Sequence, residues 1–181
     1  MNMPMKSHYS DAPKAQPQAR HTLSVLVDNE PGVLARIAGL FSGRGYNIES
    51  LTVSETEHEK HVSRITIVTT GTGQVIDQIK AQLDRLVPVH RVVDLTIQGE
   101  AIERELALVK VVGTGESRVE AMRLAGAFGA RTLDATLTSF VFEVTGTTDE
   151  IERFLRVMSV VGLVEVSRTG IAAMARGAEA L

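Results

Sequence analysis

The turn Asp28-Asn29-Glu30-Pro31-Gly32 holds the residues of this chain best suited to binding a small polar ligand. Pro31 suits the first position of a helix, because the missing N–H of proline needs no partner there. Gly32 has no side chain, so a ligand can approach its backbone closely. The unpaired amides of a first helical turn favour an anion such as a carboxylate. The turn therefore predicts binding of a small anion by the backbone.

Two asparagines flank the helix that is expected to follow this turn. Asn29 lies before it, and Asn47 lies after the glycines Gly43 and Gly45 that end it. Both side chains are short, polar and able to donate and accept hydrogen bonds, so they are candidates to line one crevice. The alternative is an ordinary helix start with Asn47 as a turn residue. Such junctions are common in α/β domains, and spacing alone leaves both interpretations open.

Hydrophobic periodicity predicts the elements that position this turn. Apolar residues alternate over 22–28, which predicts a strand, and then recur at helical spacing from Val33 onward. Further strands are expected over 47–54, 61–70 and 89–98, and a second helix over 74–86 that ends before Pro88. This β-α-β-β-α-β order is the split βαβ arrangement of ferredoxin-like folds. It predicts a four-stranded antiparallel sheet with two helices on one face.

The same order recurs in the second half of the chain. Strands are expected over 104–112, 131–137, 140–145 and 162–167, and helices over 117–127 and 150–159. In the first of these helices, Val119, Met122 and Phe128 are expected on or near the buried side. Residues 168–181 are rich in Ala and Gly and are interpreted as a short helix or a tail. The fold class is therefore α+β, with two tandem ferredoxin-like domains at 21–99 and 100–181 after a disordered tail, 1–20.

Composition narrows the class of protein. The chain has 181 residues, 44% of them apolar, a formal net charge of −3 and no cysteine. No apolar run reaches the length of a membrane-spanning helix, and the polar N-terminus lacks the apolar segment of a signal peptide. The negative charge disfavours a nucleic-acid partner. We therefore expect a cytoplasmic protein that binds neither membrane nor nucleic acid.

The sequence offers no convincing catalytic constellation. His58 and His61 lie three residues apart in an acidic loop, which is typical of a solvated hairpin rather than a metal site on rigid elements. The run Gly113-Thr114-Gly115 lacks both the third glycine of a dinucleotide fingerprint and the lysine of a P-loop. These features favour a binding or regulatory protein that holds no metal or cofactor. A small enzyme with an unrecognised site stays as an alternative.

One face of the first sheet has no helices to cover it, and its edge strands offer unpaired backbone groups to another chain. A unit of this size also buries a limited fraction of its surface. The sequence therefore predicts a homodimer formed through the first domain.

Several stretches carry a family resemblance. Residues 23–34 resemble the start of an ACT domain, a module that senses amino acids, and residues 40–53 resemble more specifically the small regulatory subunits of acetolactate synthase (acetohydroxyacid synthase). Further matches lie at 86–87, at Val92, at 104–111 and at 165–170. The tail and the loop 55–60 depart from the family pattern, and neither touches the candidate ligand turn.

The resemblance implies a function and a set of partners. A separate large catalytic subunit would condense two pyruvates, or pyruvate with 2-oxobutanoate, using thiamine diphosphate, Mg²⁺ and FAD. This chain would raise the activity of that subunit and confer feedback inhibition by a branched-chain amino acid, usually valine. ACT domains of two chains would pair, with the effector at their interface.

On this resemblance we expect the carboxylate of valine at the backbone amides of Gly32, Val33 and Leu34. The side chain of Asn29, with Asn47 and Ile48 from the neighbouring chain, would take the ammonium group and line the pocket. The first domain would supply most of the activation, and residues 102–181 would transmit inhibition about a hinge near Gly99. A free-standing ACT-type sensor that regulates another enzyme remains the alternative.

Overall fold

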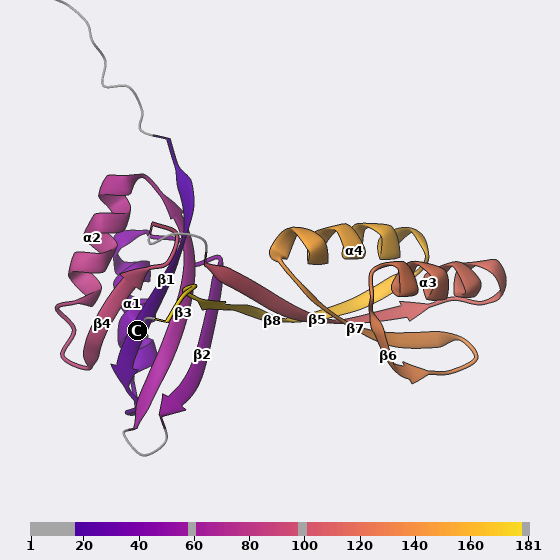
Figure 1. Cartoon of the computed structure of the whole chain (residues 1–181), viewed down its shortest axis with the longest axis horizontal. Coiled ribbons are helices and arrows are strands. Elements are labelled where there is room, and N and C mark those ends of the chain that lie inside the picture. Colours follow the sequence, from indigo (N-terminus) through magenta and orange to yellow (C-terminus); the bar gives the residue numbers. More distant parts are fainter. Residues whose placement is uncertain (1–16, 58–60, 98–100, 179–181) are drawn as a thin grey trace, which may run out of the picture.

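The structure is a computed structural model that describes residues 17–57, 61–97 and 101–178. Two four-stranded antiparallel sheets follow one another along the chain, each with two helices on one face (Figure 1). The first half contains β1 (Ala19–Asp28), α1 (Val33–Arg44), β2 (Ser50–Glu57), β3 (Val62–Gly71), α2 (Gly73–Leu83) and β4 (Val89–Asp94). Its strand order is β2-β3-β1-β4. This confirms the predicted β-α-β-β-α-β unit.

The second half repeats the arrangement with the strand order β6-β7-β5-β8. Its elements are β5 (Ile102–Val112), α3 (Gly115–Ala127), β6 (Arg131–Ala135), β7 (Ser139–Gly146), α4 (Thr148–Val160) and β8 (Leu163–Met174). Both halves therefore have the ferredoxin-like fold that the sequence predicts. The first strand begins at Ala19, so the last two residues assigned to the tail belong to β1; residues 1–16 lie outside the described part of the chain.

The core of the first domain follows from period-two alternation on β1. Leu23, Val25 and Val27 are almost fully buried and face the two helices. The helices pack against this face with apolar residues spaced three and four positions apart. Examples are Ile76, Ile79 and Leu83, which are also fully buried. Burial of each such side chain contributes about 1.5–3 kcal/mol, and the packed face fixes the register of the central strand.

The face of helix α3 that packs on the core of the second domain is not the predicted one. Val119 is 70% and Met122 is 44% exposed, whereas Ala121 and Ala125 are buried. The space beneath the helix is already filled by aromatic rings: Phe128 packs on Phe154 with ring centroids 5.4 Å apart. Small alanines at i and i+4 fit over such a layer. The prediction for Val119 and Met122 was therefore wrong, and that for Phe128 is confirmed.

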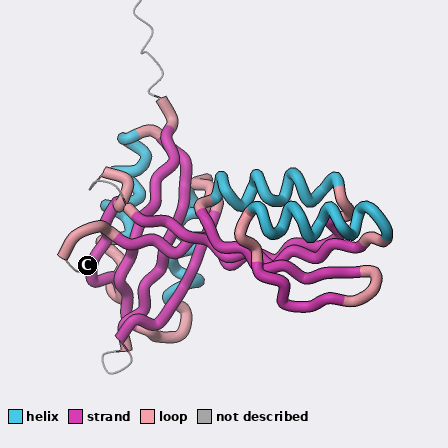
Figure 2. Tube along the Cα trace, turned by 45° about the vertical axis from the view of Figure 1, so that its right-hand side comes forward, coloured by secondary structure: helices cyan, strands magenta, loops and turns pink. Residues whose placement is uncertain are grey.

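The last strand is longer than predicted and belongs to both domains. β8 runs on to Met174 where the sequence suggested a helix or a tail, because β5 pairs with it as far as Ile102↔Met174. Both strands extend beyond the second sheet toward the first domain (Figures 1 and 2). There Ile171 and Ala173 form a small core with Val68 and Val93 of the first sheet and with Leu95, which directly follows β4. The face of the first sheet that lacks helices is thus partly covered from within the chain.

Among the described residues, none of the helices combines the length and the apolar character needed to cross a membrane. The expected hinge near Gly99 lies outside the described residues.

Candidate ligand site

The N-terminus of α1 is capped by a glycine in the left-handed conformation. Gly32 has φ 89° and ψ −7°, a region that L-residues rarely adopt, and no side chain caps the helix. The sequence suggested Pro31 at the first helical position. In the structure Pro31 instead precedes the cap residue Gly32. A Cβ placed on Gly32 would meet no atom within 4 Å, so the space over the turn is open to a ligand.

Backbone donors at the start of α1 have few acceptors among the described residues. The Val33 amide makes only a long hydrogen bond of 3.4 Å to the carbonyl oxygen of Glu30. No described residue accepts a hydrogen bond from the amides of Gly32 or Leu34. Free amides at a helix N-terminus, together with the helix dipole, favour a negatively charged group. Of the three predicted amides, two are unpaired within the described chain and the third is weakly paired.

Residues directly before β3 and β4 hold the turn in place. The Asp28 amide donates to the carbonyl oxygen of Pro88 at 2.8 Å, and the Asn29 amide donates to that of His61 at 2.6 Å. The backbone of Asn29 is therefore fixed while its side chain is exposed. An exposed amide side chain on an ordered backbone can bind a ligand with little loss of conformational entropy.

Asn47 and Ile48 lie in the connection between α1 and β2. The carbonyl oxygen of Asn47 accepts a hydrogen bond of 2.6 Å from the Thr69 hydroxyl, and its side chain is exposed. Ile48 is half-buried and packs against the first core. This pair offers a polar and an apolar group side by side, as a pocket for an aliphatic amino acid requires.

Within one chain the two halves of the predicted site do not meet. Thr69, which holds Asn47, pairs with His21 near the start of β1, whereas Asn29 follows the end of that strand. Eight residues of strand, at about 3.3 Å each, separate these levels by roughly 26 Å. A single crevice within one chain is excluded by this geometry. Any site that uses both asparagines needs a second copy of the chain.

The structure does not support a ligand-binding role for the histidine pair at 58 and 61 or for the glycine motif at 113–115. His58 lies outside the described residues, and the described ones contain no group of three His, Cys, Asp or Glu that could hold a metal. At the loop before α3, a Cβ on Gly113 would lie 2.7 Å from the hydroxyl oxygen of Ser117. Gly113 therefore lies close against the first turn of α3, where a side chain would crowd Ser117.

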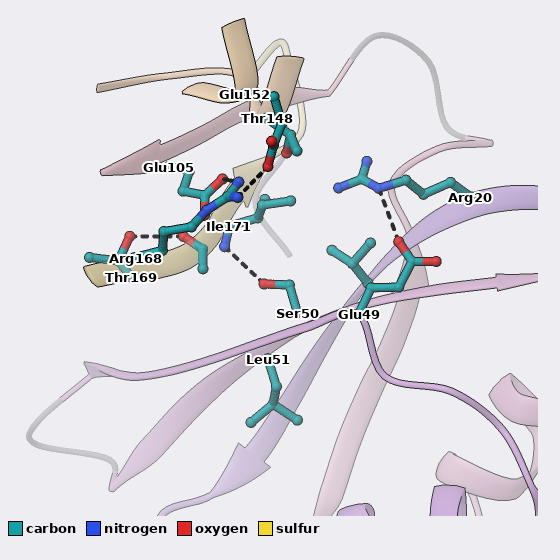
Figure 3. A pocket seen from close by; sticks show the side chains of 12 residues that line it. Arg20, Glu49, Ser50, Leu51, Glu105, Thr148, Glu152, Arg168, Thr169 and Ile171 are labelled. Atoms are coloured by element: carbon teal, nitrogen blue, oxygen red, sulfur yellow. Dashed lines mark hydrogen bonds and ion pairs between the residues drawn. The ribbon is translucent and has the colours of Figure 1, made fainter. Parts of the chain in front are cut away.

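A cavity between the two domains was not predicted from the sequence. It has a volume of about 470 Å³ and is shown in Figure 3. It is lined by Arg20, Glu49, Ser50, Leu51, Val68, Glu105, Thr148, Glu152, Arg168, Thr169, Gly170 and Ile171. Arg168 bonds to Glu105 and also to Glu152, and these hydrogen bonds raise the pKa of the Arg168 guanidinium. The cavity wall thus carries two positive and three negative side chains, and each of the three carboxylates lies beside an arginine.

The fold and the glycine turn define the class: an ACT domain followed by a second ferredoxin-like domain. Residues 23–91 match the family described as "AHAS small subunit-like ACT domain", and residues 104–177 match "Small subunit of acetolactate synthase". The chain belongs to the family of acetolactate synthase small subunits.

Individual relatives agree with this assignment over most of the chain. The "Probable acetolactate synthase small subunit" of Archaeoglobus fulgidus is 46% identical over 158 residues, 87% of this chain and 98% of that protein. The "Acetolactate synthase isozyme 3 small subunit" of Salmonella typhimurium is 45% identical over 159 residues, 87% of this chain and 96% of that protein. The crystal structure of the acetolactate synthase small subunit of Thermotoga maritima has a TM-score of 0.81 at 35% identity, covering 89% of this chain and 99% of that one.

Proposed function

We propose that this chain is the regulatory subunit of an acetolactate synthase. It raises the activity of a large catalytic subunit and makes that subunit sensitive to valine. The chain itself carries out no chemistry; thiamine diphosphate, Mg²⁺ and FAD belong to the catalytic subunit. Membership in the small-subunit family supports the partner, and the open glycine turn supports the effector.

The observation that carries the proposal is the N-terminus of α1 at Gly32, which no side chain caps. Its φ of 89° leaves the turn open, and the amides of Gly32 and Leu34 have no acceptor among the described residues. The carboxylate of valine binds there, where fixed N–H dipoles replace the water that it loses. A ligand without a carboxylate would leave these donors unpaired, which is the basis of selection.

The second half of the site comes from a partner chain. Asn47 and Ile48 of a second copy lie over the turn, close to Asn29, in a dimer of ACT domains. The amide side chains bind the ammonium group, and Ile48 contacts the isopropyl group. The separation of about 26 Å within one chain, at 3.3 Å per strand residue, is the argument for two chains.

Inhibition then requires a coupling free energy between the valine site and the catalytic subunit, typically about 1–3 kcal/mol. Valine favours one arrangement of the dimer or of the two domains over another. The first domain provides most of the activation, and the second domain transmits inhibition.

The test is acetolactate formation by the matching catalytic subunit with and without this chain, each with and without valine. The proposal expects a rise in activity on adding the chain and a fall on adding valine. No association and no change in rate would instead indicate an amino-acid sensor with another target.

A further inference from the structure

The two domains touch at a point where no side chain fits on β8. A Cβ on Gly170 would lie 2.8 Å from the hydroxyl oxygen of Ser50 and 2.9 Å from that of Thr52. Gly170 has φ 79°, so its conformation as well as its contact favours glycine. Strand β2 of the first domain and strand β8 of the second are therefore in direct backbone-to-side-chain contact (Figure 3).

A larger residue at position 170 would displace the Ser50 hydroxyl and cost it its hydrogen bond to the neighbouring strand. The oxygen of Ser50 accepts a hydrogen bond of 3.1 Å from the Ile171 amide. The oxygen of Thr52 is buried and has no partner among the described residues. The next residue, Ile171, is 4% exposed and lies in the core shared by the two domains. The contact is thus anchored on both sides.

Ser50 is also tied to the proposed valine site. Only Glu49 separates it from Ile48, and the Glu49 amide is fixed by a hydrogen bond of 2.8 Å to Val68. A movement of the connection that holds Asn47 is therefore passed to Ser50 through two ordered residues. From Ser50 it reaches β8 by the contact with Gly170.

A second polar link runs parallel to this one. The Glu49 carboxylate lies 3.6 Å from the Arg20 guanidinium, which lies 3.2 Å from the carboxylate of Glu103 at the start of β5. Glu103 also accepts a hydrogen bond from the hydroxyl of Thr22. Both strands that reach from the second domain are thus connected to the residues directly after Asn47 and Ile48.

We infer that Gly170 and Ser50 are positioning residues that transmit the state of the effector loop to the second domain. Occupation of the loop by the effector displaces Ser50, and the close contact converts this displacement into a change in the angle between the domains. The inference rests on the proposed function, because it takes valine as the effector. It adds the route by which the site acts.

The experiment compares Gly170→Ala and Ser50→Ala with Gly129→Ala in the full chain. Gly129 is the matched control, because its φ of 67° imposes similar backbone strain while a Cβ there meets nothing within 4 Å. Three quantities are measured: valine binding to the regulatory chain by calorimetry, activation of the catalytic subunit, and inhibition of the reconstituted enzyme by saturating valine.

Gly170→Ala and Ser50→Ala are expected to bind valine and to activate normally. Their residual activity at saturating valine should rise by about fivefold or more, the lower end of typical coupling factors. Unchanged inhibition in both variants would overturn the inference, as would equal loss in Gly129→Ala or loss of valine binding itself. A wild-type enzyme that ignores valine would instead refute the proposed function.

A direct readout of the angle is available because the chain has no cysteine. Spin labels at Asp77→Cys on α2 and Arg156→Cys on α4, both exposed positions, report the distance between the domains. Labelled chains are diluted with unlabelled ones so that only distances within a chain are seen. Valine should shift this distance in the wild-type background and not in Gly170→Ala; a shift in both would contradict the route.

Discussion

Arg168 holds the carboxylate of Glu105 with two parallel hydrogen bonds, at 2.6 Å from Nε and 2.7 Å from Nη2. The Glu105 side chain is only 5% exposed, and that of Arg168 is 30% exposed. This bidentate pair joins β5 to β8 where both strands leave the second sheet.

Arg168→Ala should therefore destabilise the protein by about 1–3 kcal/mol, because it leaves a buried carboxylate without its donors. The loss is measured from the midpoint of urea unfolding. Lys110→Ala is the control, since its ion pair with Glu165 is largely exposed and its loss should leave the unfolding midpoint nearly unchanged. Equal losses in the two variants would mean that burial of Glu105 has no energetic role.

Gly32→Asp should abolish the response to valine. Its carboxylate would occupy the open space over the turn and repel the carboxylate of the effector. Valine binding, followed by calorimetry, should fall by about a hundredfold or more, as loss of a charged hydrogen-bonded contact at 1.5–3 kcal/mol is joined by repulsion. Gly129→Asp is a matched substitution at a positive φ with open space around it and should bind normally. Full valine sensitivity in Gly32→Asp would place the site elsewhere.

A site shared by two chains predicts complementation between variants. Asn29→Ala and Asn47→Ala should each lose valine binding, because every site of either homodimer lacks one asparagine. In a symmetric dimer, a mixed pair regains one intact site of two. Random mixing makes half of the dimers mixed, so about a quarter of the sites should return. Titration of the mixture counts them, and no recovery would show that Asn29 and Asn47 do not form one shared site.

The core shared by the domains predicts that a residue of β8 stabilises the first domain. Ile171→Ala should destabilise the protein by about 2–5 kcal/mol, the range for truncating a buried isoleucine. Hydrogen exchange should report the loss at the amides of β3 and β4 as well as at β8. Val164→Ala on the same strand, 59% exposed, should change stability by less than about 0.5 kcal/mol. Unaltered exchange in the first sheet would show that Ile171 packs there without stabilising it.

The same core bears on the use of a chain truncated after Gln98, which would test whether the first domain alone provides the activation. Such a fragment loses Ile171 and Ala173 and exposes Val68, Val93 and Leu95 to water. Its ability to activate the catalytic subunit is therefore best measured well below its unfolding temperature, where loss of function and loss of fold can be told apart.

The sequence was sufficient for the order of elements because the periodicities of β1 and α2 are strong and local. The sequence was not sufficient where contacts with distant parts of the chain determine the local structure. Ala121 and Ala125 are less hydrophobic than Val119, yet they face the core because aromatic rings fill the space below α3. The Ala- and Gly-rich end of β8 has little intrinsic strand character, and it is a strand because β5 pairs with it.

The candidate ligand site likewise has one part that the sequence predicts and another part that it does not. The open turn at Gly32 was visible as a local pattern of Pro and Gly. The placement of Asn47 depends on the register of β2, β3 and β1, which the sequence does not reveal. The contact between Arg168 and Glu105 joins residues 63 positions apart, and so does not appear as a motif.

The shared core joins an early and a late part of the chain, so it can be completed only near the end of synthesis. Val93 is made long before Ile171, which covers the same face of the first sheet. Roughly 80 residues lie between them, so at a synthesis rate of about 5–20 residues per second this face of the first sheet stays uncovered for about 4–16 s. During that interval the nascent first domain presents an apolar strip to chaperones and to neighbouring chains.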